Sequence, residues 1–354
     1  MDFKFTDKNM NSLLPFVAPG TAVRDGIDNV LRANTGGLFV FASKEKLSHI
    51  LDGGFEINCP FSPNYLYELA KMDGAIVLSE DGSRILIANG QLSPDTSIPS
   101  SETGMRHRTA ERTAKQIGAL VIAISQRRNV ITLYKSNQRY VLRDISVMLT
   151  KSNVALATLD KYKNVLEQDL MVLSILEFDD LVTYADILNV FHRVEMVLKI
   201  KAELLEYLKE LGAEGRLIRM QMDEILYDLE KEIQWLIKDY SYSKNISSVD
   251  ICQTLENFTE AKAMDETHIL RLLGYNNQIN ELDSKKARGY RNLAKISKLP
   301  PAVIENLVEY FGDFSNIAKA KVDELDEVDG IGAIRAKKIY DGLKSIKGKF
   351  LEQQ

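Results

Sequence analysis

Two short strings in the first third of the chain combine residue types that could bind and condense nucleotides. In the first, Asp73 and Gly74 directly precede an apolar run that begins at Ala75. A carboxylate at the mouth of a strand could hold a divalent cation, and a glycine allows the backbone to approach a ligand closely. An Asp-Gly pair is equally typical of an ordinary turn, so this string alone leaves both interpretations open.

The second string places cations at the start of a predicted helix. Polar and glycine residues come first and basic residues follow: Thr103, Gly104, Met105, Arg106, His107, Arg108 and Thr109. The helix has an apolar face at Ala110, Ala114 and Ile117, and we expect it to end at Gly118. Basic side chains and free N–H groups at a helix N-terminus favour an anion, so a polyphosphate is the expected ligand. Without the upstream acid, the same helix start could hold a structural carboxylate or nucleic acid.

A third string near the C-terminus has a glycine-hydrophobic-glycine turn followed at once by a basic helix. It contains Gly330, Ile331 and Gly332, and then Arg335, Lys337 and Lys338. This string looks like a helix-hairpin-helix motif, in which the glycines and the free N–H groups of the next helix approach a DNA phosphate. Ile331 would anchor the turn in the core, and the cations would add affinity without reading bases. The alternative is a helical turn that binds nothing.

Residues 296–304 have the rhythm of a second, degenerate copy of this string, in which prolines replace the glycines. Two such copies commonly form one unit. Cations also gather just upstream and within this copy, at Lys285, Lys286, Arg288, Arg291, Lys295 and Lys298. A solvated surface could produce the same clustering by chance, so the charge pattern alone is weak evidence for a nucleic-acid partner.

The elements that must position the first two strings lie between about residues 20 and 145, where short apolar runs alternate with helical patterns. Strands are predicted at residues 38–42, 75–79, 84–88, 120–125, 130–134 and 139–142. Residues 80–83 and 126–129 read as tight turns between neighbouring strands, which predicts hairpins. Hairpins imply a mixed sheet and disfavour a doubly wound dinucleotide-binding fold.

From about residue 154 to residue 240, apolar residues recur at spacings of three and four, which predicts long amphipathic helices interrupted near Gly212 and Gly215. We expect this segment to be a spacer or an oligomer contact, and His192 within it to be structural. Residues 241–267 resemble a connector with a short helix, and a small helical module follows. The predicted class is therefore α+β with several domains: residues 1–150, 151–285 and 286–354.

Bulk properties narrow the possible functions. A chain of 354 residues is too long for one ordinary core, and 45% hydrophobic with 27% charged residues is typical of a globular protein. The net charge of −5 excludes a protein that coats nucleic acid over its whole surface. Two distant cysteines, Cys59 and Cys252, indicate neither a disulfide framework nor a thiolate zinc site. No apolar run suits a membrane span or a signal peptide, so we expect a cytoplasmic protein without a membrane partner. DNA binding through the third string would make it nucleoid-associated.

Together the first two strings resemble the defining pair of the diadenylate cyclase family, Asp-Gly-Ala and Arg-His-Arg. Both are matched without substitution. The order of cyclase (residues 1–150), helical spine (residues 151–285) and hairpin tail (residues 286–354) is similar to the DNA integrity scanning branch of that family and covers nearly the whole chain. Gln126 departs from some relatives, which have an acid after the serine.

The resemblance implies a reaction and a site. Two ATP molecules would be condensed into cyclic di-AMP with release of two pyrophosphates, and DNA bound without sequence specificity, duplex or branched, would control the reaction as part of genome integrity checking. Asp73 would hold Mg²⁺ or Mn²⁺, Gly74 would allow close approach, and Arg106, His107, Arg108 and Thr109 would hold the phosphates. The nucleotide pocket would be completed by Ala75, Leu92, Thr103, Gly104, Met105 and Ser125. Each protomer would bind one ATP, and cyclase domains would meet face to face in an octamer assembled through the spine.

Two other functions remain open at this stage. One is a DNA repair or structure-binding protein whose N-terminal domain senses ATP without cyclising it. The other is a scaffold whose hairpin tail recruits partners to DNA. Both leave the two N-terminal strings without a full role.

Overall fold

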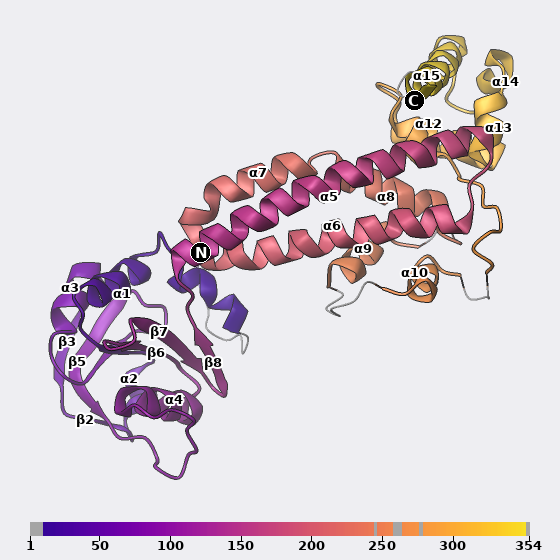
Figure 1. Cartoon of the computed structure of the whole chain (residues 1–354). Helices are drawn as coiled ribbons and strands as arrows, with labels where there is room; N and C mark the ends of the chain where they lie inside the picture. The colour runs from indigo at the N-terminus through magenta and orange to yellow at the C-terminus, as the bar shows by residue number, and fades with distance from the viewer. Residues whose placement is uncertain (1–9, 244–245, 258–263, 276–278, 352–354) are drawn as a thin grey trace. The chain divides into compact units, whose positions relative to one another are not determined.

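The computed structural model describes residues 10–243, 246–257, 264–275 and 279–351 (Figure 1). Among these residues, no helix combines the length and the apolarity needed to cross a lipid bilayer. The chain forms two compact units. The first contains the residues up to 152 together with 206–217, and the second contains residues 153–205 together with 218 onward.

The first unit is built on a mixed eight-stranded sheet in the order β2-β5-β4-β1-β6-β7-β8, with β3 paired to β5. The strands are β1 Gly37–Phe41, β2 Leu51–Asp52, β3 Phe55–Pro60, β4 Ala75–Leu78, β5 Arg84–Leu92, β6 Leu120–Ser125, β7 Val130–Lys135 and β8 Gln138–Val141. Only β1 and β4 pair in parallel; the other pairs are antiparallel. The predicted mixed sheet is therefore confirmed.

All six predicted strands are present, and both predicted turns join antiparallel neighbours. Strands β2 and β3 were not predicted. The first has only two residues, and the second contains Asn58 at a positive φ of 45° and ends at Pro60. The pairing of β3 with β5 shifts register between Glu56 and Cys59. A bulged edge strand of this kind has no period-two pattern that could reveal it.

Helices cover both faces of this sheet, with α1 Ala22–Arg32 and α3 Pro63–Leu69 on one side and α2 Lys44–Leu47 and α4 Met105–Ile117 on the other (Figure 1). Alternate residues of a strand point to opposite faces. Phe39 and Phe41 of β1 accordingly belong to the core beneath α1 and α3, while Leu38 and Val40 pack with Ala110 of α4. The resulting three layers hold the N-terminus of α4 at one edge of the sheet.

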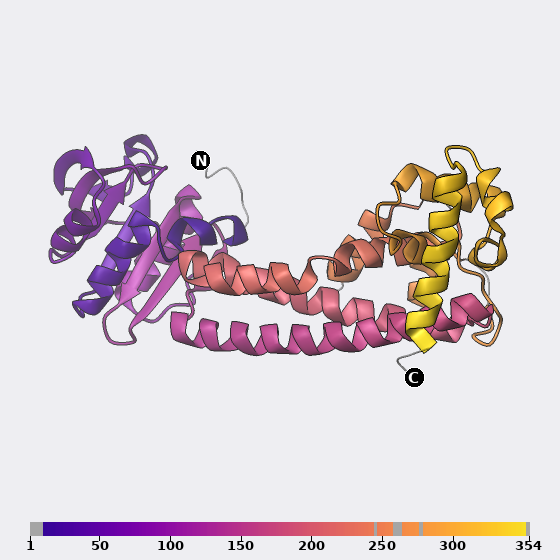
Figure 2. The same cartoon turned by 90° about the horizontal axis from the view of Figure 1, so that it is seen from above.

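The long helices follow the predicted spacing: α5 Ile145–Asp179, α6 Tyr184–Leu211, α7 Arg216–Leu226 and α8 Leu229–Tyr240. A short 3₁₀ helix, η3 Gly212–Gly215, separates α6 from α7, as the two glycines predicted. Gly212 has a positive φ of 51°. A side chain there would also collide with the carbonyl oxygen of Pro19. Helices α5 and α6 run side by side in both views (Figures 1 and 2).

Shorter helices complete the second unit. Within the predicted connector the described part contains α9 Ser248–Asn257, and α10 Glu266–Leu272 begins at its end; residues 244–245 and 258–263 of the connector lie outside the described residues. The C-terminal module consists of α11 Tyr290–Ala294, α12 Pro301–Phe311, α13 Phe314–Lys319, α14 Val322–Asp326 and α15 Ala333–Leu351. The predicted small helical module is confirmed.

Candidate functional site

One cavity of about 530 Å³ brings the two N-terminal strings together. It is formed where β4 begins, β5 ends and α4 begins. Its lining consists of Leu38, Asp73, Gly74, Ala75, Asn89, Gly90, Gln91, Leu92, Met105, Arg106 and Thr109. An exposed carboxylate and a half-buried guanidinium, from segments more than 30 residues apart in the chain, thus line one hollow.

The backbone at Gly74 explains why Asp73 lies at the rim of this cavity. Gly74 has a positive φ of 94°, and a Cβ there would lie 2.9 Å from the carbonyl oxygen of Gly90 on β5. Any larger residue would be strained and would push β5 away. Asn89, beside this contact, also has a positive φ, of 55°. The turn is therefore pressed against β5, which fixes the direction of the strand that follows Asp73.

Gly36, directly before β1, provides the space in which the Arg106 guanidinium lies. A Cβ at Gly36 would come within 2.0 Å of the Nη1 atom of Arg106. Reasoning from the sequence gave Gly36 no role in the site. The only signal was a pair of glycines before a strand, which is common in turns.

A second cavity of about 490 Å³ lies at the same helix N-terminus and shares Met105 and Arg106 with the first. Four further predicted residues line it: Thr103, Gly104, His107 and Ser125. The rest of its lining is Glu102, Gln126, Arg127, Arg128, Val130, Thr132 and Arg139. The two cavities together include every predicted residue of the nucleotide site except Arg108.

Positive charge dominates the second cavity. Among the described residues, no carboxylate pairs with the side chains of Arg106, Arg127 or Arg128. Arg139 pairs with Glu102, with 2.6 Å between its Nε atom and a carboxylate oxygen. Arg127 and Arg128 belong to the turn between β6 and β7, which the sequence identified only as a turn. Cations without partners at an open cavity favour an anionic ligand.

The surroundings of His107 favour its neutral form. Burial lowers its pKa below the ordinary value, and the positive charges of Arg106, Arg139 and Arg128 lower it further against the opposing effect of Glu102. Its ring also meets that of Tyr134 edge to face, with 6.4 Å between centroids. A neutral imidazole offers one donor and one acceptor to a ligand.

Arg108 lines neither cavity. Its guanidinium donates from Nε to the carbonyl oxygen of Glu102 at 3.3 Å and from Nη2 to that of Thr103 at 3.4 Å. The phosphate contact of Arg108 stays a prediction. The side chain holds the turn that precedes α4.

The C-terminal hairpin has the geometry that its sequence predicted. Gly330, between α14 and α15, has a positive φ of 77°, and Ile331 is buried. Gly332 has open space around it, because a Cβ there would meet nothing within 4 Å. Arg335, Lys337 and Lys338 are all exposed on the first turns of α15, and the Arg335 side chain donates to the Gly330 carbonyl oxygen.

The upstream copy forms the same turn between α11 and α12, with one correction to its expected chemistry. The Leu299 N–H donates to the Ile296 carbonyl oxygen, as the Ile331 N–H donates to that of Val328. Pro300 does stand where Gly332 stands, but the residue in the place of Gly330 is Lys298, with a positive φ of 61°. The prediction that prolines replace both glycines is thus wrong for the position of Gly330.

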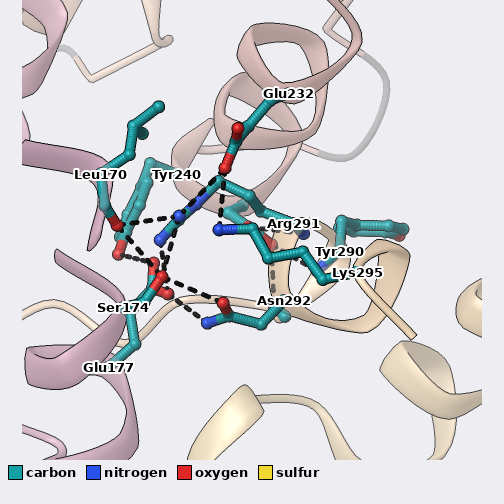
Figure 3. Close-up of polar contacts among 11 residues, drawn as sticks. Leu170, Ser174, Glu177, Glu232, Tyr240, Tyr290, Arg291, Asn292 and Lys295 are labelled. Atoms are coloured by element: carbon teal, nitrogen blue, oxygen red, sulfur yellow. Dashed lines mark hydrogen bonds and ion pairs between the residues drawn. The ribbon is translucent and has the colours of Figure 1, made fainter. Parts of the chain in front are cut away.

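A separate polar cluster in the second unit centres on Arg291, which is fully buried (Figure 3). Its guanidinium donates to the Glu177 carboxylate at 2.8 Å and to the Ser174 hydroxyl at 2.9 Å. It also reaches the Leu170 carbonyl oxygen at 3.0 Å and lies 3.5 Å from Glu232. The guanidinium of α11 is thus bound to both α5 and α8.

Asp239 of α8 completes this cluster by capping α11. Its carboxylate accepts the backbone N–H groups of Gly289, Tyr290 and Arg291 at 2.7, 2.6 and 3.0 Å. Burial, followed by the nearby charge of Glu177, raises the pKa of Asp239 to about 7. The first helix of the tandem hairpins is therefore fastened to α5 and α8 by hydrogen bonds from both its backbone and its side chains.

Three family models match successive parts of the chain. Residues 24–139 match the nucleotide-binding region of the DisA bacterial checkpoint controller, residues 142–282 match its linker region, and residues 290–345 match a SAM-like helix-hairpin-helix tandem.

Relatives match along nearly the whole length. The DNA integrity scanning protein DisA of Bacillus cereus is 55% identical over 340 residues, which covers 96% of this chain and 95% of the relative. The protein of the same name from Bacillus thuringiensis (strain Al Hakam) has the same identity and coverage. A solved structure titled hypothetical membrane spanning protein from Bacillus cereus aligns with 35% of this chain and 62% of its own, at 19% identity and a TM-score of 0.31. That likeness is too weak to bear on the fold.

Proposed function

The chain belongs to the DNA integrity scanning protein family, and from this premise we propose that it is a diadenylate cyclase that condenses two ATP molecules into cyclic di-AMP. The single observation that supports this most is the shared cavity. Asp73 and Arg106, the distinctive members of the two strings, line the same 530 Å³ hollow. An acid and a phosphate-binding helix start are the two parts that nucleotide condensation requires.

In this proposal the nucleotide spans both cavities around the N-terminus of α4. Gly104 at the N-cap of α4 provides no side-chain hydrogen bond, so the first N–H groups of the helix stay available for a phosphate. Arg106 borders both cavities, and His107 and Ser125 extend the phosphate contacts into the second. Thr103, Met105 and Thr109 line the path of the nucleotide, and Ala75 and Leu92 form the wall of the first cavity. Arg108 acts through the turn that it holds.

The donor set fits a divalent cation bound jointly by the protein and the substrate. Among the described residues, no group of three or more histidine, cysteine or acidic side chains is placed to hold a metal ion. Asp73 is the one carboxylate that lines the first cavity. Mg²⁺ typically takes one or two carboxylates together with substrate phosphates, so Asp73 would hold Mg²⁺ or Mn²⁺ with ATP. Such an ion would lower the pKa of a bound hydroxyl and offset phosphate charge.

The chemistry requires two nucleotides in opposite orientation. Each ribose 3′-oxygen forms a bond to the α-phosphorus of the other ATP, the bond from that phosphorus to the pyrophosphate oxygen breaks, and each hydroxyl proton is released. Arg106, together with the exposed Arg127 and Arg128 of the second cavity, stabilises charge that develops on the leaving pyrophosphates. One copy of the strings binds one ATP, so two protomers must meet face to face. The octamer through the spine remains a prediction, which a sizing measurement tests directly.

We further propose that the tandem hairpins bind duplex or branched DNA through backbone N–H groups and exposed cations, without reading sequence. The domain division at residues 150 and 285 belongs to this proposal. The anchoring of α11 to α5 and α8 supports control of the enzyme by DNA. A ligand that moves the hairpins would also move these two helices through the hydrogen bonds. Nucleoid association follows from the same binding.

Incubation of the full chain with ATP and Mn²⁺, followed by chromatography, tests the central proposal. We expect cyclic di-AMP and pyrophosphate. Asp73→Asn should abolish the product and leave DNA binding intact, while Asp25→Asn, an exposed aspartate on α1, serves as the matched control. ATP binding without product would favour the ATP-sensing alternative, and neither binding nor product would favour a scaffold.

Four-way DNA junctions test the coupling. The rate of cyclic di-AMP synthesis should rise or fall when a junction binds. An unchanged rate at saturating junction would reject control by DNA while leaving the cyclase proposal intact.

A further inference from the structure

Glu102 lies on the segment that leads into α4, and its carboxylate forms hydrogen bonds to the sheet. It accepts a hydrogen bond from the Tyr134 hydroxyl of β7 at 2.8 Å and another from the Arg139 Nε atom of β8 at 2.6 Å. The Glu102 side chain is 11% exposed. The carboxylate therefore fastens the segment before α4 to two strands.

The same segment is fastened to α4 from its other side. Arg108 donates to the carbonyl oxygens of Glu102 and Thr103, as described above. Glu111 of α4 accepts from the Ser100 hydroxyl and, at 3.0 Å, from the Ser101 N–H. The turn at Thr103 and Gly104 is thus held between the sheet and the helix that it starts.

This placement matters because the turn determines where the phosphate-binding groups point. The free N–H groups of α4 and the Arg106 side chain follow directly after Gly104. A displacement of about 1 Å in such groups can cost about a hundredfold in rate. A carboxylate that holds this turn can therefore govern the reaction through the groups that the turn positions.

We propose that Glu102 is a positioning residue for nucleotide condensation: by binding Tyr134 and Arg139 it fixes the turn that aims the N-terminus of α4 and Arg106 at the phosphates. This inference rests on the proposed cyclase function. It concerns a residue outside both defining strings.

Glu102 also acts on His107 through charge. The groups that face this imidazole are Arg106 on its own helix, Arg128 from the β6–β7 turn, Tyr134 of β7, Arg139 of β8, and Glu102. Burial and the three arginines lower the pKa of His107, and Glu102 is the one group among these that raises it. Removal of the carboxylate should lower the pKa of His107 further.

Two substitutions separate position from charge in the full-length protein. Glu102→Ala removes both hydrogen bonds, so kcat for cyclic di-AMP should fall about ten- to hundredfold. Glu102→Gln keeps an oxygen that can accept both bonds, so kcat should recover toward wild type. Tyr134→Phe removes one bond and should give a smaller loss than Glu102→Ala. The matched control is Glu68→Gln, which breaks an exposed ion pair with Lys71.

NMR titration of the histidines reports the arrangement without turnover, with His107→Gln used to assign the His107 signal. The pKa of His107 should fall in both Glu102→Ala and Glu102→Gln and should stay at the wild-type value in Glu68→Gln. A cyclase that is inactive in the wild-type form would reject the proposed function alone. Equilibrium ATP affinity and the His107 titration would then still test Glu102.

Two results would overturn the positioning role. One is a Glu102→Ala protein with wild-type turnover, ATP affinity and His107 pKa. The other is a loss of activity that matches a loss of folded protein in thermal unfolding and that Glu102→Gln does not restore.

Discussion

Two arginine-centred clusters in this molecule have opposite surroundings. Arg291 is fully buried, and its guanidinium contacts Glu177, Ser174, Glu232 and a backbone carbonyl. Arg106 is half-buried between two open cavities and, among the described residues, makes no hydrogen bond or ion pair. An arginine side chain thus has several protein acceptors at position 291 and, in the part of the chain that the structure describes, none at position 106.

The difference separates the structural role of Arg291 from the binding role that we propose for Arg106. A buried charge is tolerated only when neighbouring groups satisfy it, so the contacts of Arg291 are needed for folding. A charge near the surface needs no partner to be stable, so evolution can leave Arg106 available for a ligand. The number of protein acceptors around a cation is therefore a better guide to its role than its position in a basic run.

The largest expected effect comes from breaking the buried cluster around Arg291. Arg291→Met leaves Glu177 buried without its cation and should lower the free energy of unfolding by about 3–5 kcal/mol. Urea denaturation of the full-length protein measures this. Arg193→Met, which removes an exposed ion pair with Asp169, should cost less than about 1 kcal/mol. Equal losses in the two variants would contradict the comparison.

The second prediction concerns Arg106. Arg106→Gln removes a cation that the protein does not use for folding, so the free energy of unfolding should stay within about 0.5 kcal/mol of wild type. The rate of cyclic di-AMP synthesis should fall about 10²- to 10³-fold, because the negative charge on the leaving pyrophosphate loses a cation that stabilises it. Lys71→Gln provides a control at an exposed lysine. Strong destabilisation by Arg106→Gln would show that the cluster is structural after all.

A third and smaller effect is expected when the space under Arg106 is filled. Gly36→Ala places a methyl group where the guanidinium lies, and the flexible side chain must move aside. Activity should fall about tenfold, with a smaller change in thermal stability, since a shift of about 1 Å is enough for such a loss. Gly53→Ala is the control, because a Cβ at Gly53 would meet nothing within 4 Å, although the positive φ of Gly53 adds local strain. Wild-type activity in Gly36→Ala would show that the reaction does not depend on the position that the Arg106 guanidinium has here.

The fourth prediction concerns the pH dependence of stability. Burial raises the pKa of Asp239 to about 7, above the value of about 4 for an unfolded chain. Between these values the folded state binds more protons, so the contribution of Asp239 to stability is lost as pH rises from about 4 to about 7. The pKa of His107 is lowered by burial, so its contribution has the opposite sign and is lost as pH falls below about 6.5.

Urea denaturation between pH 4 and pH 8 distinguishes the two contributions. Asp239→Asn should remove the loss of stability on the alkaline side, and His107→Gln should remove a loss on the acidic side. Unchanged pH profiles in both variants would reject these assignments.

Much of the fold and the heart of the site could be predicted because their signals are local. The spacing of apolar residues in α5 to α8 and the turn between β4 and β5 are visible in a few consecutive residues. The same holds for Asp73, Arg106 and Gly330. Local residue types were enough to place these elements and to suggest their chemistry.

The remaining features depend on contacts between distant segments. Gly36 matters only because Arg106 lies over it, and Glu102 only because Tyr134 and Arg139 reach it. Arg291 belongs to a basic run that suggested a surface, yet its partners on α5 lie more than 110 residues earlier in the chain. No spacing rule within one segment reveals such contacts.

Lys298 makes the turns of the two hairpins chemically unlike. It adopts at a φ of 61° the left-handed conformation that Gly330 adopts without a side chain, at a folding cost of about 1–2 kcal/mol. In return it adds a cation that can displace a condensed counterion from a DNA strand, and each neutralised phosphate steepens the decline of affinity with salt. If the module binds DNA as proposed, the upstream hairpin presents a side-chain cation at this position of the turn, where the glycine hairpin presents only its backbone.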